Sequence, residues 1–308
     1  MLKRCACIAL VSLAYASPLR GQANIPPECA AVLEALGRQG DFKDGVCRVN
    51  LPRGDLAVAI AGRPVPTPFG FGGWLALTPA DAGSAVMMGD LVLTEDEVNP
   101  VMSALLDNGL EVTALHNHFF WESPRVFYMH VHGMGTRASL AAMVKPALAL
   151  MGSAAAGGTS GAPQPTAAAP TPAAPPDLDT AALARTIGTV GEQNGPVYKV
   201  TIGRDDLDLR HHGARIGARM GLNTWAAFTG SMDDAMVAGD VAMLETEVTG
   251  VLKALRSHGI DVVAIHQHMT GTSPTVIFLH YFGRGRADAL AQGVRAALGQ
   301  LAPAHSRQ

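Results

Sequence analysis

Apolar and polar positions alternate most clearly in residues 110–133, which we predict to form a β-hairpin. Two segments rich in β-branched, aromatic and aliphatic residues, LEVTALHNHF and RVFYMHV, flank the turn-like sequence WESP. Because successive side chains of a strand point to opposite faces, His116 and His118 are expected on one face. With the turn centred near Ser123, antiparallel pairing sets His116 roughly opposite His130, with Cβ atoms about 5 Å apart.

The pattern on either side of this hairpin predicts helices and short strands. Apolar residues at helical spacing predict three helices, the first two stopped by Gly37 and Gly109: Pro27–Leu36, 94–108 and Arg137–Leu150. Turn signals bound the expected strands: 45–50, 56–60, 74–77, 85–88 and 91–93. Gly89-Asp90 is interpreted as a break between the last two, where Asp commonly forms a turn.

The second half of the chain repeats the first. Arg53, Asp55 and Trp74 recur as Arg204, Asp206 and Trp225, and later Gly89-Asp90 recurs as Gly239-Asp240. Between the halves, Gly, Ala, Pro, Thr and Ser dominate, a composition typical of a linker. We therefore predict an α/β (α+β) fold of two homologous units, each a mostly antiparallel sheet with two to three helices. Such units can pack as a pseudo-dimer. The expected divisions are a signal peptide, a first unit, a linker and a second unit: 1–16, 28–151, 152–177 and 178–302.

The hairpin histidines recur with the same spacing in DVVAIHQHMTGTSPTVIFLHYFG, residues 261–283. Each unit thus carries one set of three, namely His116, His118 and His130 in the first and His266, His268 and His280 in the second. Three imidazoles on one face of two adjacent strands suit a divalent metal with an open position, zinc first, and also copper, nickel or iron. A hydrogen-bonded polar patch is the main alternative. His132 is left out of the set, because Phe282 stands at the equivalent position.

Glu122, in the turn of the first hairpin, is a candidate fourth ligand or acid/base group acting on metal-bound water. Thr272 stands at the equivalent position of the second unit, and Thr275 replaces Arg125. We therefore expect the first site to be active and the second to be structural or degenerate. The alternative for Glu122 is a solvated turn residue.

Glu97 lies at the third position of a predicted helix, where Thr94 and Glu97 match a capping box. In the second unit Leu244 replaces Thr94 while Glu247 is retained. Retention of the acid without its capping partner indicates a second role, such as orienting a metal-ligating His through a hydrogen bond. For Arg53, an ion pair with Asp55 is preferred over binding of an anionic substrate.

The N-terminal residues have the pattern of a secretory signal peptide. Lys3 and Arg4 precede CACIALVSLAYA, and the cleavage site is placed after Ala16. This apolar stretch is too short to span a bilayer, which needs about 20 residues. We expect export to the periplasm or beyond, with no membrane span after cleavage. The remaining Cys29 and Cys47 are then expected to form a disulfide, with two buried free thiols as the alternative.

Composition excludes one class of partner. Charged residues make up 16% of the chain and its net charge is −3, so there is no basic footprint for nucleic acid. Hydrophobic residues make up 48%, enough for one large core or two ordinary ones among 308 residues.

A family resemblance rests on the longest motif. The segment GDLVLTEDEVNPVMSALLDNGLEVTALHNHFFWESPRVFYMH (89–130), with LPRGDLAV (51–58), GDVAMLETEV and AIHQH, resembles the repeat unit of the LppY/LpqO family of exported bacterial proteins. This resemblance implies an exported protein of two units and no particular activity. Named members look like lipoproteins, whereas Cys5 and Cys7 come too early here for lipid attachment. In spacing alone, the hairpin is also similar to the zinc site of acetolactate decarboxylase, an analogy about site type.

Two functions stay open on the sequence. One is an exported metal-dependent hydrolase or decarboxylase of a small substrate, in which the metal polarises a carbonyl or activates water and Glu122 is the acid/base group. The other is a non-catalytic metal- or ligand-binding protein of the cell envelope. A purely structural role for the histidines is the third interpretation. The sequence specifies neither the substrate nor the ligand.

Overall fold

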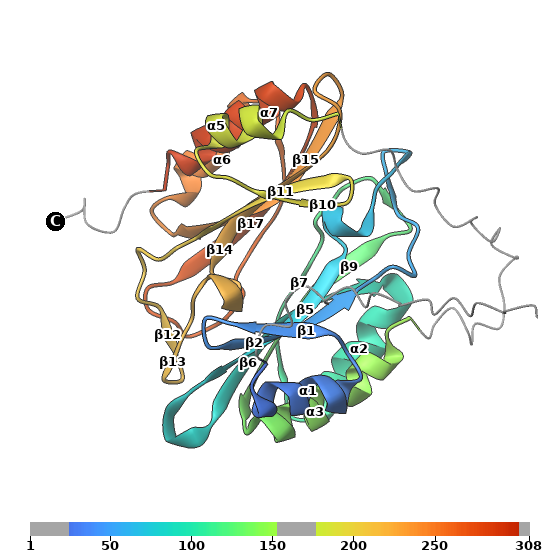
Figure 1. The fold of residues 1–308 in the computed structure, drawn as a ribbon, viewed down its shortest axis with the longest axis vertical. Coiled ribbons are helices and arrows are strands. Elements are labelled where there is room, and N and C mark those ends of the chain that lie inside the picture. The colour runs from blue at the N-terminus through green and yellow to red at the C-terminus, as the bar shows by residue number, and fades with distance from the viewer. Residues whose placement is uncertain (1–24, 153–176, 302–308) are drawn as a thin grey trace, which may run out of the picture.

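The computed structural model describes residues 25–152 and 177–301, so the expected signal peptide, Cys5, Cys7 and nearly all of the expected linker lie outside the described residues. Two six-stranded sheets lie at the centre, and helices cover the outer face of each (Figure 1). The predicted fold class is confirmed, since the two halves are similar and each combines helices with a mostly antiparallel sheet.

The two sheets have the same strand order and antiparallel pairing. The first has the order β1-β2-β5-β6-β9-β7, with bounds Gly40–Lys43, Val46–Pro52, Gly72–Pro79, Ala85–Thr94, Val126–Gly135 and Glu111–His116. The second has the order β10-β11-β14-β15-β17-β16, with bounds Glu192–Asn194, Val197–Gly203, Asn223–Gly230, Ala235–Leu244, Val276–Gly285 and Asp261–His266. Two small sheets lie in the loops: β3 (Ala59–Ile60) with β4 (Arg63–Pro64) and β8 (Glu122–Ser123), and β12 (Arg210–His211) with β13 (Ala214–Arg215).

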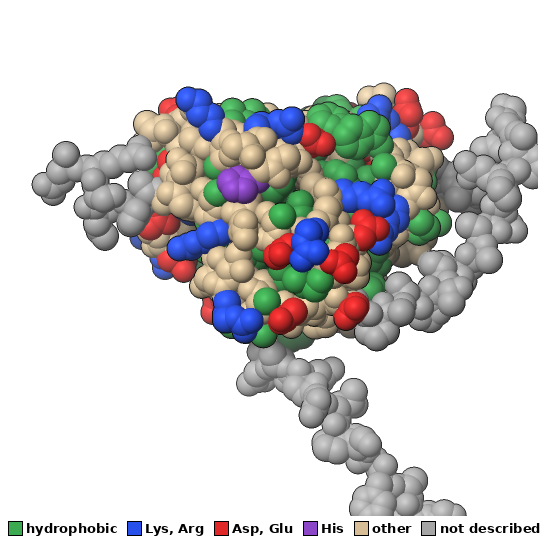
Figure 2. Space-filling view, turned by 90° about the horizontal axis from the view of Figure 1, so that it is seen from above, with side chains coloured by type: hydrophobic (Ala, Val, Ile, Leu, Met, Phe, Trp, Pro, Cys, Tyr) green, Lys and Arg blue, Asp and Glu red, His purple; other side chains and the backbone are tan. Residues whose placement is uncertain are grey.

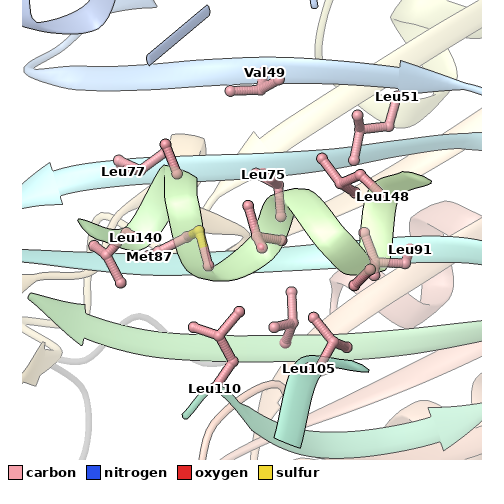
Figure 3. Packing of buried hydrophobic residues seen from close by; sticks show 14 of the residues in the cluster. Val49, Leu51, Leu75, Leu77, Met87, Leu91, Leu105, Leu110, Leu140 and Leu148 are labelled. Carbon is pink, nitrogen blue, oxygen red and sulfur yellow. The ribbon is translucent and has the colours of Figure 1, made fainter. Parts of the chain in front are cut away.

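The outer face of each sheet forms a core with its own helices. The helices are α1 (Pro27–Leu36), α2 (Glu95–Asp107) and α3 (Arg137–Leu150) in the first unit, and α5 (Thr180–Ile187), α6 (Val248–Ser257) and α7 (Ala287–Leu298) in the second. In the first unit, Leu75 and Met87 of the sheet point toward Leu140 and Leu148 of α3 (Figure 3). The bounds predicted for α1 and α3 are confirmed, and α2 lies within its predicted range between the flanking residues Thr94 and Asn108.

The inner faces of the two sheets are covered by exchanged loops. The loop between β11 and β14 supplies Leu209, Ile216 and Met220 to an apolar cluster with Val86 and Met88 of the first sheet. The loop between β2 and β5 reciprocates, packing Ile60, Phe69 and Phe71 with Met236 and Phe282 of the second sheet. The two units therefore bury their inner faces against each other, in an arrangement in which equivalent surfaces meet.

One predicted break does not exist. Strand β6 runs without interruption through Gly89-Asp90, and Asp90 pairs with His130 on one side and Trp74 on the other. The prediction used the low strand propensity of Gly and Asp. Gly89 fits because a Cβ there would meet Leu75 at 2.5 Å and the Trp74 carbonyl at 2.8 Å. The close packing of three strands, and not a turn, explains this glycine.

Cys29 of α1 and Cys47 of β2 are joined by a disulfide that closes a loop with a sequence separation of 18. Replacing both by Ser is expected to lower the free energy of unfolding by about 3 kcal/mol, because the unfolded chain regains the entropy of the open loop. Urea denaturation of the variant measures this change. Wild-type protein under reducing conditions is the control and should give the same midpoint; an unchanged midpoint after reduction would contradict the expectation.

The surface carries no concentration of positive charge on the side that Figure 2 shows. Lys and Arg side chains there are interspersed with Asp and Glu. Within residues 25–152 and 177–301, no helix has both the length and the apolar character needed to cross a membrane.

Candidate metal centre

The first hairpin forms, but its register differs from the predicted one. Strand β7 pairs with β9 so that His116 lies opposite Tyr128, and Ala114 lies opposite His130. The register shifts between Val112 and Ala114, and β8, within the connection, pairs with β3 instead of forming a tight turn. The expectation that His116 lies roughly opposite His130 was therefore wrong by two residues. Both still lie on the same face, because the shift leaves their strand parity unchanged, and their ring centroids are 5.1 Å apart.

All six hairpin histidines meet between the two sheets. The rings of the equivalent residues His116 and His266 stack with centroids 3.8 Å apart. On either side the contacts are reciprocal, with 3.6 Å between His118 and His280 and 4.0 Å between His130 and His268. The histidines of each hairpin thus pack against histidines of the other unit.

The groups whose ligand atoms come close enough for one metal ion combine both units. One is His116, His130 and His266, and the other is His116, His118 and His280; in each, the ligand atoms lie within 4.8 Å of one another. By the equivalence of the repeats, His266, His268 and His130 are the counterpart of the second group. The sequence assigned His130 to one set with His116 and His118, whereas the structure places His280 beside His118.

The spacing of the nitrogens fits a metal ion with small ring rotations. Two nitrogens bound to one tetrahedral zinc at about 2.1 Å lie about 3.4 Å apart and can never be more than about 4.2 Å apart. The Nε2 atoms of His130 and His266 are 3.1 Å apart. The wider groups, with ligand atoms within 4.8 Å, need shifts of less than about 1 Å to meet this limit.

Two of the imidazoles are oriented by backbone carbonyls. Nδ1 of His130 lies 3.2 Å from the Gly89 carbonyl oxygen, and Nδ1 of His280 lies 3.3 Å from that of Gly239. A ring N–H that donates to a carbonyl fixes the tautomer and leaves Nε2 with its lone pair free, which is the state of a metal-ligating His.

The centre is buried and its imidazoles are held neutral. Both ring nitrogens of His116 and of His118 are buried without a hydrogen-bond partner among the described residues. Burial lowers the pKa of His130 to about 3 and that of His266 to about 2. Burial is the main cause of a lowered pKa at four further histidines, and repulsion from neighbouring imidazoles adds to it: His116, His118, His268 and His280. Buried polar atoms without partners are uncommon in folded proteins, so this cluster requires an explanation.

Two carboxyl groups that the sequence assigned to turns lie in this interior. Burial raises the pKa of Asp90 to about 8, against the opposing effect of Arg48. Burial also raises the pKa of Asp240, and the neighbouring Asp90 adds to that shift. Oδ2 of Asp240 lies 3.6 Å from Nε2 of His268. Asp90 of β6 pairs directly with His130 of β9, and Asp240 of β15 pairs directly with His280 of β17. The available signal was the recurrence of Gly-Asp at equivalent positions of the two units, as Gly89-Asp90 and Gly239-Asp240.

Glu122 lies in β8, opposite Ile60 of β3, and neither histidine group includes it. It is not a solvated turn residue, since its side chain is only 1% exposed, and its nearest charged partner is Arg125 at 3.6 Å. Burial raises the pKa of its carboxyl group. A buried carboxyl group with a raised pKa is a candidate acid/base group, as the sequence suggested.

Glu97 and Glu247 have partners other than histidines. Glu97 forms a buried ion pair of 2.6 Å with Arg53 and accepts a hydrogen bond of 2.9 Å from the Thr94 N–H. Glu247 forms the equivalent 2.9 Å pair with Arg204. The predicted pair of Arg53 with Asp55 is also present, at 2.7 Å. The role suggested for these acids in orienting ligand histidines is instead performed by the Gly89 and Gly239 carbonyls.

Comparison with known proteins gives a family and little else. No curated protein matches the chain. Two solved structures of similar length are a trimeric bacterial microcompartment shell protein, PduB, and EtuB from Clostridium kluyveri. The first is 13% identical over 86% of this chain and 91% of that one, with a TM-score of 0.21; the second is 12% identical over 85% and 89%, with a TM-score of 0.20. These scores are too low to support any inference. The family model described as Domain of Unknown Function (DUF1259) matches residues 30–150 and again residues 181–300, and the chain belongs to this family, with two copies of the domain in tandem.

Proposed function

We propose that this protein binds a divalent transition metal between its two units through the six hairpin histidines, with zinc as the preferred candidate. The observation that carries the proposal is the cluster of buried imidazoles whose ring nitrogens have no hydrogen-bond partner among the described residues: His116, His118 and His268 on both nitrogens, and His266 and His280 on one. Imidazole is a ligand that zinc, copper and nickel share, and a bound metal would satisfy one ring nitrogen of each histidine that ligates it.

The ligand sets are proposed to cross the unit boundary. His116, His118 and His280 form one set. By the equivalence of the repeats, we assign His266, His268 and His130 to its counterpart, since the rings of His130 and His268 lie 4.0 Å apart. In this arrangement neither unit holds the metal alone, and metal binding stabilises the packing of one unit on the other. The reciprocal ring contacts of 3.6 and 4.0 Å support this assignment.

Metal content after chelation and reloading with zinc tests the proposal. His116→Ala is expected to weaken zinc binding by more than about 100-fold, since the ligand itself contributes more than the 10–100-fold typical of its supporting hydrogen bonds. His118→Ala and His280→Ala should each weaken zinc binding at the same site. The double variant should lose little more zinc affinity than either single variant, because the two residues ligate one ion. Mass spectrometry for metals together with a competition titration measures both quantities.

His258→Ala is the matched control, because His258 is exposed at the end of α6 and belongs to none of the histidine groups. It should bind zinc as the wild type does. If His116→Ala retained the wild-type zinc affinity, the proposal would be wrong. If His118→Ala and His280→Ala affected two different ions, the crossed ligand sets would be wrong.

A second candidate function is hydrolysis or decarboxylation of a small carbonyl or ester substrate. The buried Glu122, with its raised pKa and no counterpart in Thr272, favours it. Glu122→Thr, which installs the residue of the second unit, is expected to keep zinc and to lose activity in a screen of esters and 2-oxo acids. A zinc-loaded wild type inactive on every class would leave the non-catalytic binding function.

We further propose that the chain is exported and belongs with the LppY/LpqO proteins that it resembles. The pattern of residues 1–16 supports export, as does the disulfide between Cys29 and Cys47. N-terminal sequencing of the protein from the producing cells is expected to begin at Ser17.

A further inference from the structure

A second cluster of histidines lies apart from the six hairpin residues. His132 of β9 in the first unit meets His211 and His212 of the β12–β13 hairpin in the second unit. Their ligand atoms lie within 4.8 Å of one another, which is as close as in the central groups. We propose that these three histidines form a separate site for a divalent transition metal, which links the two units at one edge of their interface.

The backbone brings the three rings together in an unusual way. His212 and Gly213 form the two-residue turn between β12 and β13, with φ of 48° and 78°. Neighbouring side chains of an extended strand point to opposite faces, whereas positive φ at both turn residues changes that direction. The rings of His211 and His212 consequently lie 4.2 Å apart, beside the ring of His132.

One ligand atom is buried and lacks a partner. His132 is 1% exposed, and its Nε2 has no hydrogen bond among the described residues. Its Nδ1 lies 4.0 Å from the carboxylate of Glu111, which faces it across β7 and β9. His212 is exposed, so an ion bound here would reach solvent on one side. Three imidazoles with one open position are the usual ligands of zinc that retains a water molecule.

The equivalent place on the other side of the molecule provides the strongest argument. Phe282 stands where the first unit has His132, and Ile60 and Ala61 stand where the second unit has His211 and His212. Ala61 has the same φ of 48° as His212, so the backbone of the turn is unchanged. Ile60 and Phe282 belong to one apolar cluster. All three positions are therefore histidine on one side and apolar on the other, which indicates a unit of function, because histidines that share no ligand would have no reason to change together.

The equivalent positions on the other side of the molecule also supply the test variant. In the full chain, His132→Phe, His211→Ile and His212→Ala together install residues that the same backbone already accepts. After chelation, equilibrium dialysis against zinc chloride and metal analysis should show one bound zinc fewer than in wild type. His212→Ala alone, at an exposed position, should weaken that zinc by more than tenfold. Zinc should also raise the thermal unfolding midpoint of wild type by more than it does for the triple variant.

Two controls separate this site from the central one. His258→Ala removes an exposed histidine elsewhere and should bind the same zinc as wild type. His116→Ala should retain the zinc that the triple variant loses, whatever becomes of the hairpin site. The inference would be overturned if the triple variant bound as much zinc as wild type, or if His258→Ala lost as much zinc as the triple variant.

Discussion

Acidification of the metal-free protein from pH 6.5 to pH 5 is expected to lower its free energy of unfolding by several kcal/mol. Burial lowers the pKa of His130, His266 and His132 to about 3, 2 and 4, whereas an exposed histidine of the unfolded chain titrates at 6.5. Between these values the unfolded chain binds protons that the folded chain does not. Stability therefore falls as pH falls, by about 1.4 kcal/mol per pH unit for each histidine and about 4 kcal/mol per pH unit for the three.

The other central histidines add to this slope, and three buried carboxyl groups oppose it. The pKa of Asp90 rises from 3.8 to about 8 and those of Asp240 and Glu122 also rise, so the folded chain holds protons that the unfolded chain releases. The contribution of Asp90 is fully present below pH 3.8 and is lost as pH rises to about 8. Between pH 4 and 6.5 the histidines outnumber the carboxyl groups. Above pH 6.5 the carboxyl groups lower the stability as pH rises, whereas the buried Lys199, whose pKa is lowered to about 8, raises it from about pH 8 upward. Stability should accordingly be highest near pH 6.5.

Urea denaturation of chelator-treated protein, at intervals from pH 5 to 8, measures this profile. Because metal binding requires neutral imidazole, added zinc should extend the stable range toward lower pH. His258→Ala, which removes an exposed histidine, should leave the profile unchanged. A flat profile between pH 6.5 and 5 would show that the histidines are not held neutral in the folded protein.

The sequence alone predicted the elements whose residues carry local signals. The bounds of α1 and α3 follow from apolar spacing and from Gly37, which adopts the left-handed conformation at the end of α1. The repeat predicted two similar units, and strand parity predicted that His116 and His130 share a face. These inferences depend on residues near one another in the chain, so tertiary contacts did not override them.

The features that the sequence missed depend on contacts between distant segments. The hairpin register follows from the shift near Ala114 and from the pairing of β8 with β3, neither of which has a local signal. Gly89 looked like a break because nothing in its neighbourhood shows Leu75 packing against it. The crossed histidine groups arise only when equivalent faces of the two units meet. One signal was available for the second cluster: the three positions at which the repeats exchange His for apolar residues.

Removal of Glu97 is expected to destabilise the protein by about 3–5 kcal/mol, because the buried Arg53 guanidinium loses its buried partner and keeps only the half-exposed Asp55. Arg53 is 4% exposed and Glu97 is 2% exposed. Nη1 of Arg53 donates to Glu97 at 2.6 Å and to the Val92 carbonyl at 2.7 Å, and Glu97 also accepts from the Gly152 N–H at 2.6 Å. The pair therefore connects β6, the start of α2 and the end of the first unit.

Three variants separate the contribution of the charges to stability from that of side-chain packing: Glu97→Ala, Arg53→Met and the double variant Arg53→Met/Glu97→Met. The double variant should recover much of the loss, since it buries no unpaired charge. Asp55→Asn is the control, because the side chain of Asp55 is 46% exposed and its pair with Arg53 should contribute less than about 1 kcal/mol. Urea denaturation gives the free energies, and zinc titration of each variant gives a second reading. The ion pair with Arg53 predicts that Glu97→Ala loses much stability while its folded fraction keeps the wild-type zinc affinity. If Glu97→Ala were instead as stable as Asp55→Asn but bound zinc more weakly, Glu97 would act on the metal centre.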